Sequence, residues 1–231
     1  MNTEPQRSED AWAPITTKNR PREWVAAILF SAVSCWFVMA YHDWGRAKPY
    51  SIGTLSEALA HTAFYGLALA FAIGPLYRFG IMPARAVAGR RPFGIVAVIC
   101  AMVHALLSLT VLRPNSGWDH FVVKHWDHTV LGVLGIVLAV ILLATSFGNA
   151  FQRLGEARWF RIQAAGLAML PVALLHFMAL GKFTRWVDWF GGRDKNPAPP
   201  GTLIIFCVGV FVIALRVIDA LRRWKRRNNA S

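Results

Sequence analysis

Charged side chains are scarce in this chain of 231 residues. They make up 16% of the sequence, whereas hydrophobic side chains make up 55%. So few charges cannot cover the surface of a water-soluble domain of this size. A soluble globular protein is therefore excluded, and the composition predicts an integral membrane protein.

Cysteine is also rare, and several cofactor-binding motifs are missing. Cys35, Cys100 and Cys207 are odd in number and form no CxxC pair, so neither a disulfide framework nor a zinc site is indicated. The sequence has no Walker motif and no GxGxxG after a predicted strand. Binding of ATP or a nicotinamide by the usual loops is therefore excluded, and a redox function would need electrons from another molecule.

The sequence does contain long apolar runs. A helix needs about 20 apolar residues to cross roughly 30 Å of hydrocarbon, and six stretches meet this requirement: residues 23–41, 54–79, 93–112, 128–147, 160–181 and 202–221. They predict an all-α fold, a six-transmembrane-helix bundle over residues 23–221. An N-terminal tail, 1–22, precedes the bundle and a basic tail, 222–231, follows it.

The distribution of Lys and Arg predicts the orientation, because basic segments resist translocation. The N-terminal tail, the second-to-third and fourth-to-fifth connections and the C-terminal stretch hold 17 of the 25 cations. Both termini are therefore expected in the cytoplasm, with the chain in the cytoplasmic membrane. This asymmetry and attraction to anionic lipid headgroups explain the net charge of +13, so membrane lipid is the expected partner and nucleic acid is not.

Three histidines lie deep inside the predicted spans. His104 is about 11 residues into the third span, roughly 17 Å from its cytoplasmic edge, and His176 is about 16 residues into the fifth, roughly 24 Å. His61 is about seven residues into the second span, which enters from the outside. All three are expected in the outer half of the membrane, where a buried titratable ring marks a candidate functional site.

Two imidazoles on different helices of an apolar bundle suit a haem b with two axial histidines. His104 and His176 are the candidate ligands of the haem iron. The alternative for each ring is an interhelical hydrogen bond to a carbonyl or hydroxyl group, which is common in membrane bundles.

Several short motifs carry a family resemblance. They are IGPLYR at 73–78, RRPFG at 90–94 with His104 beyond it, ATSF at 144–147, RLG at 153–155, WFRIQ at 159–163 and LLHF at 174–177. Their order and spacing over residues 54–220 resemble the ferric-reductase-like transmembrane domain family, and within it the haem-binding membrane subunits of bacterial periplasmic methionine sulfoxide reductase systems. The resemblance implies a six-helix haem b protein that passes electrons across a membrane, with His104 and His176 at the ligand positions.

One departure from the family pattern affects the number of haems. The family has a histidine early in the fifth span that is implicated in a second haem, and this chain has Gln163 there. Glutamine is a poor substitute for imidazole on iron, so one outer haem is expected rather than two, and Gln163 is read as a vestigial inner-haem position. His61 is expected beside the outer haem, where it could donate to a propionate or line an electron exit.

The loss of an inner haem raises the question of the electron donor. A quinol could be oxidised within the membrane, or a flavin such as FMN could bind at the cytoplasmic face beside four arginines: Arg90, Arg91, Arg158 and Arg161. The alternative role of these arginines is topology and headgroup contact. The acceptor is expected to be a periplasmic redox partner protein.

The outer connection between the third and fourth spans adds His120, His125 and His128. His125 and His128 form an HxxH pair that could bind a metal ion with further ligands, or the group could dock the periplasmic acceptor. A belt of His and Trp at the membrane interface is the alternative. The sequence thus predicts a cytochrome b-like electron carrier that needs a partner; the rival class is a non-redox membrane protein whose histidines pack helices or bind a small ligand.

Overall fold

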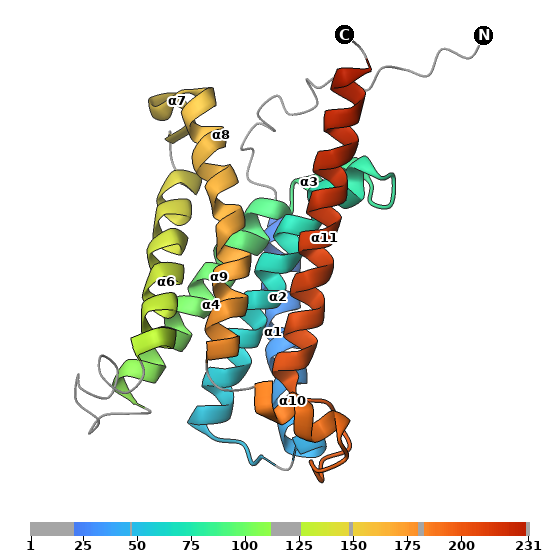
Figure 1. Ribbon diagram of the computed structural model, residues 1–231. Coiled ribbons are helices and arrows are strands. Elements are labelled where there is room, and N and C mark those ends of the chain that lie inside the picture. The colour runs from blue at the N-terminus through green and yellow to red at the C-terminus, as the bar shows by residue number, and fades with distance from the viewer. Residues whose placement is uncertain (1–20, 47, 112–125, 148–149, 180–182, 230–231) are drawn as a thin grey trace.

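The fold consists of helices that run roughly along one axis (Figure 1). The structure, a computed structural model, describes residues 21–46, 48–111, 126–147, 150–179 and 183–229, and these residues form no strand. The elements are α1 (Pro21–Ala40), a π-helical turn (Tyr41–Gly45), α2 (Ile52–Arg78), α3 (Ala84–Val87), α4 (Arg90–Thr110), α6 (Trp126–Ser146), α7 (Ala150–Leu154), α8 (Glu156–Ala165), a 3-10 turn (Gly166–Ala168), α9 (Met169–Phe177), α10 (Phe183–Phe190) and α11 (Gly201–Asn228).

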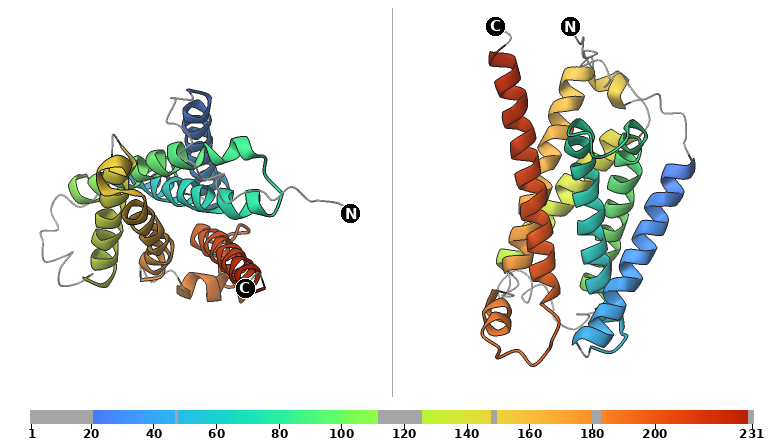
Figure 2. Two further views of the ribbon diagram at one scale, coloured as in Figure 1. Left: turned by 90° about the horizontal axis from the view of Figure 1, so that it is seen from above. Right: turned by 90° about the vertical axis from the view of Figure 1, so that its right-hand side faces the viewer.

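Six of these helical segments are long and apolar enough to cross a membrane, which confirms the predicted six-transmembrane-helix bundle. Five of them contain α1, α2, α4, α6 and α11, and the fifth in chain order joins α8 to α9. The start of α1 and the end of α11 lie at the same end of the bundle, here called the terminal end (Figures 1 and 2). The start of α2 and the helix α10 lie at the opposite end, here called the far end.

Helix α2 is the most buried span, and α1, α4 and α11 pack against it. Small residues permit this packing: a Cβ added at Gly66 would lie 3.1 Å from the Cβ of Ala97 on α4. In a membrane, no hydrophobic force drives helices together. Small residues at the interface let the helices approach closely, so that van der Waals packing holds them together. A second unit pairs α6 with α9 and meets the first through α4 and α11.

Helix α6 shows how the outer surface of the bundle is built. Its side chains are mostly apolar, and the exposed ones include Val130, Val133, Val137 and Ile141. Ala139, which is 1% exposed, is its buried contact with the core. An apolar surface of this kind suits contact with lipid tails rather than water.

The fifth span is broken in the middle. Pro171 lacks the N–H that would bond four residues back, and its ring crowds the preceding turn. The chain accordingly narrows into a 3-10 turn at Gly166–Ala168 before α9 begins at Met169. Gln163 therefore lies on α8 and His176 on α9, on opposite sides of an interruption in helical phase.

Candidate functional site

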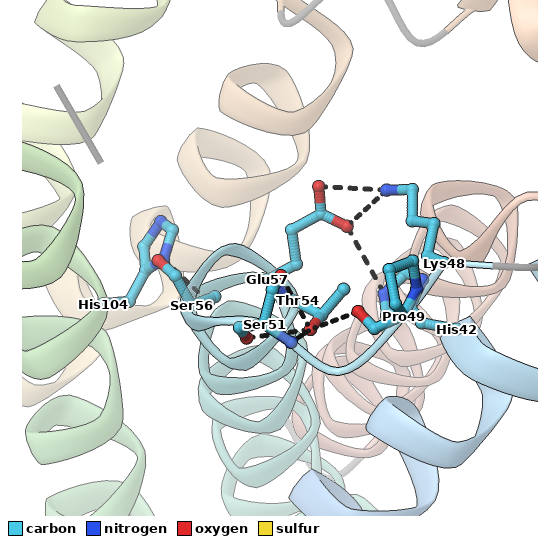
Figure 3. Close-up of polar contacts among 8 residues, drawn as sticks. All are labelled: His42, Lys48, Pro49, Ser51, Thr54, Ser56, Glu57 and His104. Carbon is cyan, nitrogen blue, oxygen red and sulfur yellow. Dashed lines mark hydrogen bonds and ion pairs between the residues drawn. The ribbon is translucent and has the colours of Figure 1, made fainter. Parts of the chain in front are cut away.

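His104 lies against the first turns of α2 at the far end of the bundle (Figure 3). Its Nδ1 is 2.9 Å from the backbone carbonyl oxygen of Ser56 and 2.9 Å from the Ser56 hydroxyl. A carbonyl oxygen can only accept a hydrogen bond, so the short contact places the proton on Nδ1. The lone pair of the neutral ring is then on Nε2. A histidine that ligates a metal commonly has this arrangement, with one nitrogen donating to a carbonyl and the other left to bind.

The N-terminal end of α2 explains why Ser56 lies beside His104. Helix α2 begins with a capping box, in which the Ser51 hydroxyl accepts from the Thr54 N–H at 3.1 Å and Thr54 Oγ1 accepts from the Ser51 N–H at 2.7 Å. This box fixes the first turn of α2. Ser56, which is 1% exposed, follows within the next turn and faces α4. Ser108, one turn beyond His104, places its hydroxyl 3.4 Å from that of Ser56.

His176 lies on α9 and packs against α6. A Cβ added at Gly132 would lie 3.2 Å from Cε1 and 3.5 Å from Nδ1 of the imidazole, so a larger residue at this position would require the ring to shift by a few tenths of an ångström. The rings of His104 and His176 are half-buried and near enough to interact electrostatically. The structure thus brings the two predicted ligands, from α4 and α9, to the same region of the far end.

His61 is buried between several helices, with 5% of its surface exposed. Its ring centroid is 6.0 Å from that of Phe177 and 6.4 Å from that of Tyr65. A Cβ at Gly201, the first residue of α11, would lie 2.7 Å from its Cε1. His61 therefore occupies the junction of α2, α9 and α11. Its neighbour on α9, Phe177, directly follows His176 in the chain.

His42 is a functional candidate that the sequence analysis missed. It lies in the π-helical turn that ends the first span, is 5% exposed, and its ring centroid is 5.7 Å from that of His61. Its Nε2 is 3.5 Å from Oε2 of Glu57, which also accepts from Lys48 Nζ at 2.8 Å (Figure 3). In the sequence, His42 lies in the stretch YHDW at the end of the first apolar run. A search for histidines deep inside the predicted spans does not include this position.

An ion pair ties the same π-helical turn to the segment before α11. Arg46 donates to Asp194 Oδ2 at 2.7 Å and to the Ala198 carbonyl at 2.9 Å. Hydrogen bonds from Asn196, together with Arg46, lower the pKa of Asp194 to about 2. Asp194 is therefore ionised at neutral pH, and the contact links the end of α1 to the start of α11 across the far end.

Gln163 does not lie near the other candidate ligands. Its Nε2 donates to the Thr145 hydroxyl at 3.1 Å, and the indole of Trp159 donates to the Thr145 carbonyl at 3.0 Å. Both contacts join α8 to the last turn of α6. Gln163 thus serves as an interhelical hydrogen-bond donor at the position where the family pattern has histidine.

The four arginines considered for a flavin do not form one group in the structure. Arg90 points toward α2, where it donates to the Ala70 carbonyl, while Arg91 stacks over Phe147 with its Cζ 5.9 Å from the ring centroid. Arg158 and Arg161 are exposed on α8. Adjacent residues differ by about 100° around a helix, which is why Arg90 and Arg91 face different neighbours.

The outer histidines fall largely outside the part of the chain that the structure describes. His120 and His125 lie beyond the described residues, as does the side chain of His128, so the predicted HxxH metal site stays a prediction. Within the described residues, no group of three or more His, Cys, Asp or Glu side chains is arranged to hold a metal ion. Cys35, Cys100 and Cys207 are free thiols in the structure.

Comparison with models of protein families finds none that matches this chain, and comparison with curated proteins finds no significant similarity. The resemblance to the ferric-reductase-like family therefore stays a prediction that depends on the motifs themselves. What the structure supplies is the placement of four histidines, His42, His61, His104 and His176, at one end of a six-helix membrane bundle.

Proposed function

We propose that this protein is a membrane haem b protein that carries electrons from a quinol or flavin donor toward an extracytoplasmic acceptor, with His104 and His176 as the axial ligands. The observation that carries the proposal is the hydrogen bond from His104 Nδ1 to the Ser56 carbonyl. It leaves Nε2 of a half-buried imidazole as a lone-pair donor inside an apolar bundle, which is the state that iron ligation requires.

The surroundings of the two rings fit the group. His104 and His176 come from different helices, α4 and α9, and each would supply one ring nitrogen to hold the haem iron. Apolar core residues such as Phe64, Leu170 and Leu174 belong to the same bundle interior. When bound, haem b supplies reversible one-electron chemistry at its iron. The chain's own contribution is to orient the two nitrogens, to exclude water and to hold the proton of His104 on Nδ1.

The proposal favours one haem over two. An inner haem would need a strong ligand near Gln163, and this side chain is engaged with the Thr145 hydroxyl. His61 and His42 lie at the far end, too remote from α8 to serve an inner site. We assign His61 a supporting role beside the outer haem, either as donor to a propionate or at an electron exit.

The direction of electron flow follows from the cation distribution. The connections at the terminal end hold the larger share of Lys and Arg, which places that end in the cytoplasm and the histidines toward the outside. The protein is then a subunit of the cytoplasmic membrane whose haem faces a periplasmic redox partner protein.

Substitution of single histidines tests the assignment. In His104→Ala or His176→Ala, the purified protein should lose most of its haem while still inserting into the membrane, because the apolar spans are unchanged. His120→Ala is the matched control: it removes an imidazole from the connection between the third and fourth predicted spans and should leave haem content unchanged. Haem content is measured as the α-band of the dithionite-reduced protein per mole of chain.

The same experiment separates the rival class, a membrane protein without redox function whose histidines only pack helices or bind a small ligand. In that protein the His104–Ser56 hydrogen bond is purely interhelical. His104→Ala would then lower thermal stability, and no variant would show a haem spectrum to lose.

A further inference from the structure

A cluster of partly exposed arginines lies at the terminal end of the bundle, away from the histidines. It comprises Arg78 at the end of α2, Arg90 at the start of α4, and Arg216 and Arg223 on α11. We call this set, together with Asp219, the arginine cluster. Three helices that are distant in sequence thus bring their guanidinium groups together.

Asp219 is the carboxylate of the cluster and already serves two arginines. It is 2% exposed, and it accepts hydrogen bonds from Nε and Nη2 of Arg78 in a bidentate pair. Arg223 Nη2 lies 3.5 Å from the same carboxylate. The carboxylate of Asp219 is therefore already engaged by Arg78 and Arg223.

Arg216, in contrast, lies against groups that carry no negative charge. Arg90 donates to the Ala70 carbonyl at 3.2 Å, and Arg216 lies over the ring of Phe71 with its Cζ 5.6 Å from the centroid. The buried Nε of Arg216 has no hydrogen-bond partner among the described residues. A buried donor left without an acceptor costs free energy, so this atom marks a place where an acceptor belongs.

Gly74 on α2 lies beside two of these side chains. A Cβ at this position would lie 3.6 Å from Nη2 of Arg78 and 3.6 Å from Nη1 of Arg90. The two guanidinium groups therefore lie over the same bare stretch of α2. Planar guanidinium groups bind the oxygens of a phosphate group in bidentate fashion.

Charge and depth agree with such a ligand. Arg216 interacts electrostatically with Arg78, Arg90 and Arg223 and with the carboxylate of Asp219, so cationic neighbours of Arg216 outnumber anionic ones within this set. Arg216 is 15 residues into α11, about 22 Å along the helix, so the cluster lies near the level where hydrocarbon gives way to headgroups. Basic pockets between helices on the cytoplasmic side of a membrane bind anionic headgroups.

We propose that the arginine cluster is a binding site for a phosphate group, and that its occupant is the phosphodiester of an anionic membrane lipid. The site would hold the lipid headgroup between α2, α4 and α11 and so stabilise the terminal end. A soluble phosphate monoester, such as flavin mononucleotide, presents the same chemistry from the aqueous side. This inference does not depend on haem binding.

Native mass spectrometry of the full chain in a neutral detergent tests the proposal. The probes are short-chain phosphatidylglycerol, short-chain phosphatidylcholine and flavin mononucleotide, each titrated separately. Arg216→Gln is the test variant, and Arg227→Gln is the matched control because it removes the same charge from an exposed turn of the same helix. Arg216→Lys keeps the charge and serves if the glutamine variant does not fold.

We expect wild type to bind phosphatidylglycerol in preference to phosphatidylcholine. Arg216→Gln should weaken this binding roughly tenfold, the effect of losing one charge-assisted hydrogen bond, with Arg216→Lys intermediate and Arg227→Gln close to wild type. Tighter binding of flavin mononucleotide with the same dependence on Arg216 would overturn the lipid assignment and keep the phosphate site. Equal affinity for both lipids, or equal losses in the Arg216 and Arg227 variants, would overturn the site itself.

Discussion

Replacement of Asp219 by asparagine should destabilise the bundle strongly, because the carboxylate holds α2 to α11 at the terminal end. Its side chain is 3% exposed and that of Arg78 is 23% exposed. Asparagine keeps the size of the side chain, removes the charge and turns an N–H group toward the guanidinium donors. Removing one partner of a buried ion pair costs about 3–5 kcal/mol. Since Arg78 retains some access to water, we expect about 3 kcal/mol, the lower end of that range.

The assay is reversible unfolding of the purified chain in mixed micelles, followed by tryptophan fluorescence. Asp188→Asn is the matched control, because Asp188 pairs with Arg193 at 3.1 Å but the two side chains are 48% and 68% exposed. An exposed pair contributes less than about 1 kcal/mol. A double-mutant cycle with Arg78→Gln isolates the coupling between the two residues. If Asp219→Asn is no more destabilising than Asp188→Asn, the ion pair is not a structural link and the reasoning is refuted.

Three further predictions concern the inner haem position, the orientation and the far end. Gln163→His should raise the haem-to-protein ratio, since imidazole supplies the ligand that glutamine lacks; an unchanged ratio would show that this position does not face a porphyrin. A reporter fused after Ser231 should stay in the cytoplasm and one inserted near Asn196 should reach the outside, whereas the reverse pattern would remove the reason for a periplasmic partner. Asp194→Asn should lower the thermal midpoint by a constant amount between about pH 5 and 8. Because the folded-state pKa of Asp194 is depressed to about 2 from an ordinary value of about 3.9, the carboxylate stabilises the fold above that ordinary value, so the difference between variant and wild type should shrink as the pH falls from about 4 toward 2. A difference that persists at the lowest pH would contradict the role of the ionised carboxylate.

The six spans could be predicted from the sequence because hydrocarbon thickness fixes the length of an apolar helix. The break in the fifth span follows from Pro171, although the narrow turn at Gly166–Ala168 begins earlier than the proline itself. The grouping of His61, His104 and His176 at one end was likewise accessible, because helix direction and residue count determine depth.

Contacts between distant residues were not predictable in this way. Arg78 and Asp219 are 141 positions apart, and no sequence pattern in α2 or α11 indicates that these two residues pair. His42 was missed because it lies just past the first apolar run, where a π-helical turn folds it back against His61. The separation of Arg90 from Arg91 depends on which helix packs against each face of α4. Helix packing, rather than hydropathy, decides all three.

The haem-to-protein ratio of the purified natural chain is the most direct test of whether His104 and His176 hold a haem. The measurement compares the dithionite-reduced absorption spectrum and the extracted haem with the chain concentration. We expect a haem b α-band and a ratio near one. A ratio near two would show that residues other than a histidine at position 163 hold an inner haem. A reduced sample with no α-band, from cells supplied with haem, would contradict the claim.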